Sequence, residues 1–520
     1  MSRPKQYLFA LISLTTLATV PHLVVAQDAA GTVFGGRDPQ AEAAFNAGVE
    51  QMQQENWEQA IDAFSKAIAI DNTFPQAYLG RADALRNLED YSSALQSYQR
   101  ALDFLQGAGP STLTASAFNG RGVCSRELGQ IDLALSDFNN AIEMDRNNPE
   151  IAANYGDLLV NRVGDPTTAL RFLDKAIELD PENAKTFRNR GMAHAQIREF
   201  EESIADLLKS VELDPTDYET YTTLASIHIA QEEYEEAIEA IAKAVEHYEP
   251  KQSSDPQIFI DGLLRRSELR LKLALDEETT QERREELYQA MLADTDRVLA
   301  EFPDRFPESG MALYQRGLAA RLQGHLSEAI KAFTDAIQLV PAGNEAGYLA
   351  DAFLKRGICW HYQGQESLAR GDFEQASSIN FEDPLPHLWI GLSHAQEGDY
   401  REAIESYGEA IAKAPTFPAP YVNRGLAYLQ LEGYQKAIDN FNEAIRSEPT
   451  EPEHFFKRGV AHMKLEEYQK AFDSFHHATL NDEKMAKAFR GAARALDALG
   501  RTSLAEQYES RAKALEANAG

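Results

Sequence analysis

A small residue recurs along this chain at a nearly constant interval. Thirteen positions carry glycine, alanine or serine in a similar local context, and seven of the twelve intervals between them are 34 residues long. These positions are Gly48, Ala82, Gly122, Gly156, Gly191, Ala225, Ser267, Gly317, Gly357, Gly391, Gly425, Gly459 and Ala493. A fixed period of this length indicates stacked supersecondary units, none of which can bury its apolar face alone.

Other positions of the repeat explain how such a unit packs. In the repeat of Gly425, an alanine follows at Ala437, an aromatic side chain at Phe441 and a second alanine at Ala444, and most repeats share this order. Small residues let two antiparallel helices approach closely, and the aromatic side chain packs between neighbouring helices. Proline cannot continue helical hydrogen bonding, so it marks the end of the second helix. Prolines of this kind are Pro181, Pro215, Pro341, Pro415 and Pro449.

The segment from Asn423 to Ile445 resembles a near-consensus tetratricopeptide repeat. About thirteen units in the same register extend the resemblance over roughly residues 41–515. The resemblance implies an all-α fold, a right-handed superhelical solenoid of about thirteen helix-turn-helix hairpins. It also implies protein binding rather than catalysis.

The repeats are not evenly distributed. A linker at 27–40 precedes six repeats at 41–249, and six more repeats occupy 304–520. Residues 250–303 form a divergent repeat with an insertion of eleven residues, which includes the charged run Asp276–Glu286, and its two small-residue positions hold Ser267 and Asp294. We expect a hinge or irregular joint there. Nine identical residues at an offset of 235, Cys124 and Cys359 among them, indicate that a six-repeat block was duplicated.

Residues 1–26 have the order of a secretory signal peptide. Arg3 and Lys5 are followed by an apolar run, a helix-breaking Pro21 and small residues suited to cleavage after Ala26. We therefore expect a periplasmic or secreted protein of a bacterial type. The alternative is an uncleaved N-terminal membrane anchor. No later segment approaches 18 consecutive apolar residues, so no integral membrane segment is expected in the mature chain.

The charge balance limits the classes of partner. Without Arg3 and Lys5 the chain holds 48 basic and 82 acidic residues, a net charge of −34. Such a surface repels the phosphates of nucleic acid and the headgroups of anionic membranes. Protein or peptide partners remain, and the charge weakly favours basic partners or divalent cations.

Nothing in the sequence indicates catalysis or a cofactor. It contains no phosphate-binding glycine loop, HExxH pair, GxSxG elbow or CxxC motif, and the repeats occupy nearly the whole chain. We therefore expect neither an enzyme nor a resident cofactor or metal. Cys124 and Cys359 occupy the same tight repeat position and are expected to be buried free thiols, too far apart for a disulfide.

Histidines and arginines also follow the repeat frame. Four histidines lie three residues after a small residue, where core packing is expected rather than metal binding: His194, His228, His394 and His462. An arginine precedes the small residue in eight repeats. In three of these repeats an aspartate follows sixteen residues later, which predicts structural ion pairs between the two helices: Arg121 with Asp137, Arg190 with Asp206, and Arg356 with Asp372.

A binding surface is expected on the first helix of each repeat. In the resembled family, first-helix positions 2, 5, 9, 12 and 13 line a concave face, with the small residue at position 8. Positions 5 and 9 are apolar in the second array: Tyr314, Leu318, Leu354, Ile358, Leu388, Leu392, Val422, Leu426, Phe456 and Val460. In the first array the same positions are mostly polar, as at Asn119, Arg188, Thr222, Asp83, Asp157 and Ser226.

Two interpretations of the apolar stripe remain open. It is either a groove that binds an extended peptide or an amphipathic helix, or packing buried between neighbouring repeats. The favoured function is a non-catalytic scaffold or adaptor that holds a peptide or protein segment. The alternative is a chaperone-like or transport component that holds client proteins of the cell envelope.

Overall fold

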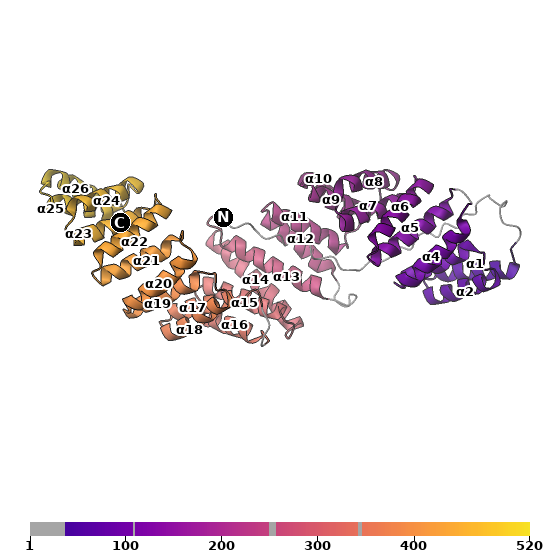
Figure 1. Cartoon of the computed structure of the whole chain (residues 1–520), viewed down its shortest axis with the longest axis horizontal. Helices are drawn as coiled ribbons and strands as arrows, with labels where there is room; N and C mark the ends of the chain where they lie inside the picture. The colour runs from indigo at the N-terminus through magenta and orange to yellow at the C-terminus, as the bar shows by residue number, and fades with distance from the viewer. Residues whose placement is uncertain (1–36, 108–109, 249–255, 342–345, 520) are drawn as a thin grey trace. The chain divides into compact units, whose positions relative to one another are not determined.

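The computed structural model describes residues 37–519, apart from 108–109, 249–255 and 342–345. The described residues form 26 α-helices and no strands, so the prediction of an all-α fold is confirmed. The expected signal peptide and most of the expected linker lie outside the described residues. The chain divides into two compact units, Met1–Tyr248 and Glu249–Gly520. Figure 1 shows both units as successions of helical pairs.

The first unit contains six hairpins. Its helices are α1 (Pro39–Gln53), α2 (Trp57–Ile70), α3 (Pro75–Asn87), α4 (Tyr91–Leu105), α5 (Thr112–Glu127), α6 (Ile131–Met144), α7 (Pro149–Leu158), α8 (Pro166–Leu179), α9 (Ala184–Gln196), α10 (Phe200–Leu213), α11 (Tyr218–Ala230) and α12 (Tyr234–His247). Each odd-numbered helix packs against the even-numbered helix that follows it, and each hairpin packs against the next.

The second unit contains seven hairpins. Its helices are α13 (Gln257–Ala274), α14 (Gln281–Glu301), α15 (Glu308–Leu322), α16 (Leu326–Gln338), α17 (Leu349–Tyr362), α18 (Glu366–Ile379), α19 (Leu385–Glu397), α20 (Tyr400–Lys413), α21 (Pro418–Gln430), α22 (Tyr434–Ser447), α23 (Pro452–Lys464), α24 (Tyr468–Asn481), α25 (Ala486–Ala498) and α26 (Thr502–Ala519). Thirteen hairpins in all agree with the number of small-residue positions.

The small residue and the aromatic side chain of a repeat meet as the sequence predicts. Phe373 and Phe441 are fully buried, as are the equivalent aromatic side chains of most other repeats. A Cβ added to Gly357 would lie 2.6 Å from the ring of Phe373, closer than van der Waals contact permits. Glycine at this position therefore allows the first helix to lie directly on the aromatic ring of the second.

Departures from the 34-residue interval have local causes. The 35-residue step from Gly156 to Gly191 contains a π-helical turn at Leu159–Val163, which accommodates one extra residue at the end of α7. The two 40-residue steps correspond to longer connections, α4 to α5 and α16 to α17. Second helices end two or three residues before the closing prolines, for example at Leu179 before Pro181.

The divergent repeat differs from the expectation in two respects. Its extra residues mainly lengthen the helices, because α13 has 18 residues and α14 has 21, with a short turn between them. Asp294 does not occupy a small-residue position as expected. Both its carboxylate oxygens accept hydrogen bonds from Arg266, at 2.9 and 2.5 Å, so it is the ion-pair residue of this repeat.

Candidate protein-binding surface

The ten apolar residues predicted at positions 5 and 9 lie on α15, α17, α19, α21 and α23, the first helices of five consecutive hairpins. We call them the first-helix stripe. Three are buried: Leu354, Ile358 and Leu388. The other seven are partly exposed: Tyr314, Leu318, Leu392, Val422, Leu426, Phe456 and Val460. The stripe is therefore divided between packing and accessible surface.

Tyr314 belongs mainly to the packing. Its ring stacks on Tyr348 with centroids 5.8 Å apart, and its hydroxyl donates a hydrogen bond of 2.5 Å to Asp351. Burial, with the nearby Asp351 carboxylate, raises the pKa of Tyr314 far above its usual range. The hydroxyl is thus a permanent donor that ties α15 to α17.

The position-9 residues share one arrangement. Each packs beside the core cluster that holds the aromatic side chain of its own repeat, as Leu426 does beside Phe441 and Leu392 beside Tyr407. All except the buried Ile358 nevertheless keep part of the side chain in contact with solvent. Because the core holds one side of each of these residues in place, little side-chain entropy is lost when a partner covers the other side.

The equivalent face of the first unit is polar and internally bonded. The Asn119 side chain donates to Glu150 at 3.2 Å and accepts from Asn154 at 3.1 Å, which links α5 to α7. Arg188 on α9 donates twice to Asp217, at 2.8 and 2.9 Å. Much of this face therefore satisfies its polar groups internally.

Asp157 belongs to this polar face. It accepts a hydrogen bond from Arg126, and its side chain is 13% exposed. Burial alone would raise the pKa of Asp157, but the positive charges of Arg126 and Lys185 lower it. The Asp157 carboxylate therefore stays ionised near neutral pH, and its pairing with Arg126 joins α7 to α5.

The three predicted ion pairs between first and second helices are confirmed. In the pair with the clearest geometry, Arg356 donates to both oxygens of Asp372 at 2.8 and 2.7 Å. Arg121 with Asp137 and Arg190 with Asp206 repeat this two-point contact. Three of the other arginines use a neutral acceptor at the same spacing: Ser97, Asn440 and Ser474. These arginines are structural and are not free to bind a partner.

The cysteines are free and buried, as predicted. Burial raises the pKa of the Cys124 thiol to about 12 and that of the Cys359 thiol to about 11. Both thiols stay protonated near neutral pH, and a protonated thiol is a poor nucleophile.

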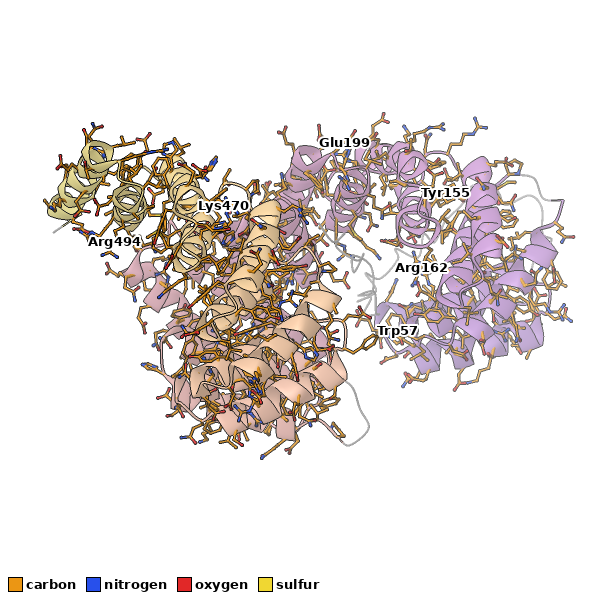
Figure 2. The ribbon with its side chains drawn as sticks, turned by 60° about the vertical axis from the view of Figure 1, so that its left-hand side comes forward. Trp57, Tyr155, Arg162, Glu199, Lys470 and Arg494 are labelled. Atoms are coloured by element: carbon orange, nitrogen blue, oxygen red, sulfur yellow. The ribbon has the colours of Figure 1, made fainter. Side chains whose placement is uncertain are left out.

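The histidines are bonded in a way that the repeat frame alone did not indicate. Nδ1 of His194 lies 2.7 Å from the carboxylate of Glu199, which is labelled in Figure 2, and the two residues bracket the turn between α9 and α10. His228, His361 and His462 make the same contact with a glutamate five residues later. A histidine followed at this spacing by glutamate is visible in the sequence and could have predicted the contact.

His394 is the exception among the predicted core histidines. Asp399 replaces the glutamate, and Nδ1 of His394 makes no hydrogen bond. Ligand atoms of His394, Glu397 and Asp399 lie within 4.8 Å of one another, a spacing that a metal ion could bridge. Both carboxylates are exposed, and Arg370 already binds Glu397, so its charge opposes a cation there.

No helix among the described residues is long and apolar enough to cross a bilayer.

Comparison with known proteins identifies the same type of repeat in both units. Family models described as TPR repeat or tetratricopeptide repeat match residues 48–88, 74–147, 125–184, 162–218, 207–239, 310–342, 391–432 and 422–478. Human tetratricopeptide repeat protein 13 is 32% identical over 126 residues, 24% of this chain and 13% of that protein. Mouse tetratricopeptide repeat protein 16 is 38% identical over 63 residues, 12% of this chain and 8% of that protein. The chain thus spans only a small part of these relatives.

Solved structures with related folds include MamA, YrrB and a chain of the APC/C hetero-tetramer Cut9–Hcn1. MamA is 20% identical and covers 31% of this chain and 95% of its own, with a TM-score of 0.30. YrrB, described as a TPR protein with an unusual peptide-binding site, is 25% identical and covers 35% of this chain and 89% of its own, with a TM-score of 0.29. A chain of the APC/C hetero-tetramer Cut9–Hcn1 is 14% identical and covers 92% of this chain and 94% of its own, with a TM-score of 0.33.

Proposed function

Since the chain belongs to the tetratricopeptide repeat family, we propose that it is a non-catalytic scaffold that holds a peptide or protein segment on the first-helix stripe of its second unit. The observation that carries this proposal is the set of seven partly exposed apolar side chains on four first helices, α15, α19, α21 and α23. Burying such side chains against a partner removes apolar surface from water, worth roughly 25 cal/mol for each Å².

The polarity of the two units supports the choice of surface. In the first unit, side chains such as Asn119 and Arg188 already bond to their neighbours, so a partner would have to replace existing hydrogen bonds. In the second unit, Leu392 and Leu426 have no polar requirement and gain by being covered. The preferred partner segment is therefore apolar on one side.

The test compares two matched double substitutions. Leu392→Asn with Leu426→Asn changes the first-helix stripe, while Leu368→Asn with Leu480→Asn changes exposed leucines on second helices, which are 51% and 62% exposed. Each protein is used to capture partners from its native compartment, and thermal unfolding confirms that both remain folded. The proposal expects the stripe variant to lose its partner by more than about tenfold and the control to keep it.

The outcome also separates two modes of action. One partner recovered in fixed stoichiometry identifies an adaptor, whereas many unrelated proteins identify the chaperone-like alternative. Equal capture by both double variants would contradict the proposed surface.

We propose in addition that the protein acts in the periplasm or outside the cell, which rests on the order of residues 1–26. Alkaline phosphatase fused after residue 40 should be active only if this segment directs export. Removal of residues 1–26 should abolish that activity, and an active fusion without them would contradict the proposal.

A further inference from the structure

Three aromatic rings gather where α17 meets α19. Tyr362 ends α17, His361 precedes it, and Trp389 lies on α19. The ring centroids are 5.8 Å apart for His361 and Tyr362, 5.5 Å for His361 and Trp389, and 6.2 Å for Tyr362 and Trp389. The planes of these pairs are inclined by 59°, 72° and 74°, so the ring faces point in different directions.

This aromatic cluster is accessible and rigid. Tyr362 is 64% exposed, among the most exposed large side chains of the described residues. The Trp389 ring is held in place because it stacks on the buried ring of Phe373, with centroids 6.1 Å apart. A supported aromatic ring with an open face can bind a ligand without losing much side-chain entropy.

The repeat itself does not require aromatic residues at these positions. Tyr362 is five residues after the small residue Gly357, and the residues at the same place in the hairpins of His194, His228, His394 and His462 are Gln196, Ala230, Gln396 and Lys464. Packing of the hairpins therefore leaves the exposed ring of Tyr362 unexplained.

A carboxylate lies close to the rings. Glu366 begins α18, and its Oε2 lies 2.9 Å from Nδ1 of His361. The residue is only 6% exposed, and its other oxygen, Oε1, has no hydrogen-bond partner. The dipole at the start of α18 stabilises the negative charge of Glu366. The C-terminal end of α17 carries the negative pole of its own dipole and makes the surroundings of the rings more negative.

The cluster is continuous with the first-helix stripe. Tyr362 is four residues after Ile358 on α17, and Trp389 is three residues before Leu392 on α19. Residues three or four apart in a helix share a face, so a segment lying on the stripe would pass the aromatic cluster.

We propose that Tyr362 and Trp389, with the buried Glu366 nearby, bind the cationic group of an arginine or lysine side chain in the partner segment. This inference rests on the proposed function, because it names a feature of the segment that the stripe holds. Aromatic faces attract cations, and a nearby carboxylate that cannot reach solvent strengthens the attraction. A net charge of −32 for the whole chain favours the same type of partner.

The first test measures cation binding directly. The chain contains three tryptophans, Trp57, Trp360 and Trp389, so 5-fluorotryptophan gives three fluorine resonances, of which Trp389 is assigned by Trp389→Phe. N-acetyl-arginine amide is the probe, and its neutral isostere N-acetyl-citrulline amide is the control. The proposal expects a saturable shift of the Trp389 resonance, at least about fivefold weaker with citrulline, and no shift of Trp57.

Variants separate the ring from the fold. Tyr362→Leu should weaken the arginine probe by about fivefold, whereas Tyr362→Phe should change its affinity by less than about twofold. Because Tyr362 is mostly exposed, both variants should unfold at the same temperature as the unchanged protein. Equal responses to arginine and citrulline, or equal affinity in both variants, would overturn the inference.

Failure of the inference is distinguishable from failure of the proposed function. If the stripe variant loses its captured partner but arginine does not shift Trp389, the scaffold function stands and the cation site is wrong. If arginine shifts Trp389 but the stripe variant keeps its partner, the site is real and the surface proposed for the partner is wrong.

Discussion

At the turn inside each of twelve hairpins, one residue adopts a left-handed backbone conformation. Some of these turns use glycine, such as Gly364 with φ 73°, and others use glutamate, such as Glu432 with φ 59°. A side chain is disfavoured in this conformation, because its Cβ crowds the following carbonyl group. Turns with glutamate therefore carry a local cost that turns with glycine avoid.

Exchanging these residues should change stability in opposite directions. Glu432→Gly should raise the free energy of unfolding by about 0.5–1 kcal/mol, whereas Gly364→Ala should lower it by about 1 kcal/mol. Urea titration followed by circular dichroism measures both changes. A destabilised Glu432→Gly protein would show that its side chain makes a contact worth more than the backbone cost.

The ion pairs between helices are expected to matter more than the many exposed pairs. In the Arg356–Asp372 pair the side chains are 16% and 9% exposed, so removing one partner leaves the other charge poorly solvated. Asp372→Ala should lower the free energy of unfolding by about 3 kcal/mol. Glu178→Ala, in the exposed pair of Lys175 and Glu178, should cost less than about 0.5 kcal/mol. The same urea titration compares them, and equal losses would contradict the structural role of the buried pair.

At the scale of one element, α7 shows how a helix absorbs an extra residue. The π turn at Leu159–Val163 occupies the one step of 35 residues, and Gly164 follows it with φ 75°. The hairpin keeps its packing because Leu158, Leu159 and Val160 remain buried through the irregular turn.

Removing the extra residue should therefore be tolerated. Deletion of Val163, which is 41% exposed, restores the usual length and should cost less than about 1 kcal/mol. Deletion of Met192 from the middle of α9 shifts Ala193 and every later contact of that helix, and should cost several-fold more. Thermal unfolding of the two proteins tests this order, and equal losses would show that the π turn is required.

At the scale of the whole molecule, the repeats make stability local. Within each unit, a hairpin packs mainly against its neighbours in the chain, so a defect destabilises nearby hairpins first. Phe441→Ala removes a fully buried ring from the hairpin of α21 and α22 and should cost about 3–5 kcal/mol locally. Hydrogen exchange should show faster exchange in α21–α24 than in α1–α12. Uniform loss of protection over both units would contradict local stability.

Much of the fold could be predicted because the same pattern of packing residues recurs in most repeats. The spacing between the small residue and the aromatic residue, as from Gly357 to Phe373, is the same in most repeats. The spacing from Arg356 to Asp372 also recurs, and both spacings are satisfied when the two helices of one hairpin pack against each other. The alignment of Asp294 was wrong because the divergent repeat lengthens both helices, which no spacing rule indicates. The burial of Leu354 against the partial exposure of Leu392 depends on how neighbouring hairpins pack, which positions in one repeat do not determine. The aromatic cluster around Tyr362 was missed because its residues come from two different hairpins.

The proposed function requires that the first-helix stripe of the second unit contacts a partner. A photo-crosslinking amino acid placed at Leu392, with the same group at Leu368 as control, tests this claim most directly in the native compartment. We expect a discrete crosslinked species from position 392 and none from position 368. Crosslinks from Leu368 alone, or the same species from both positions, would contradict it.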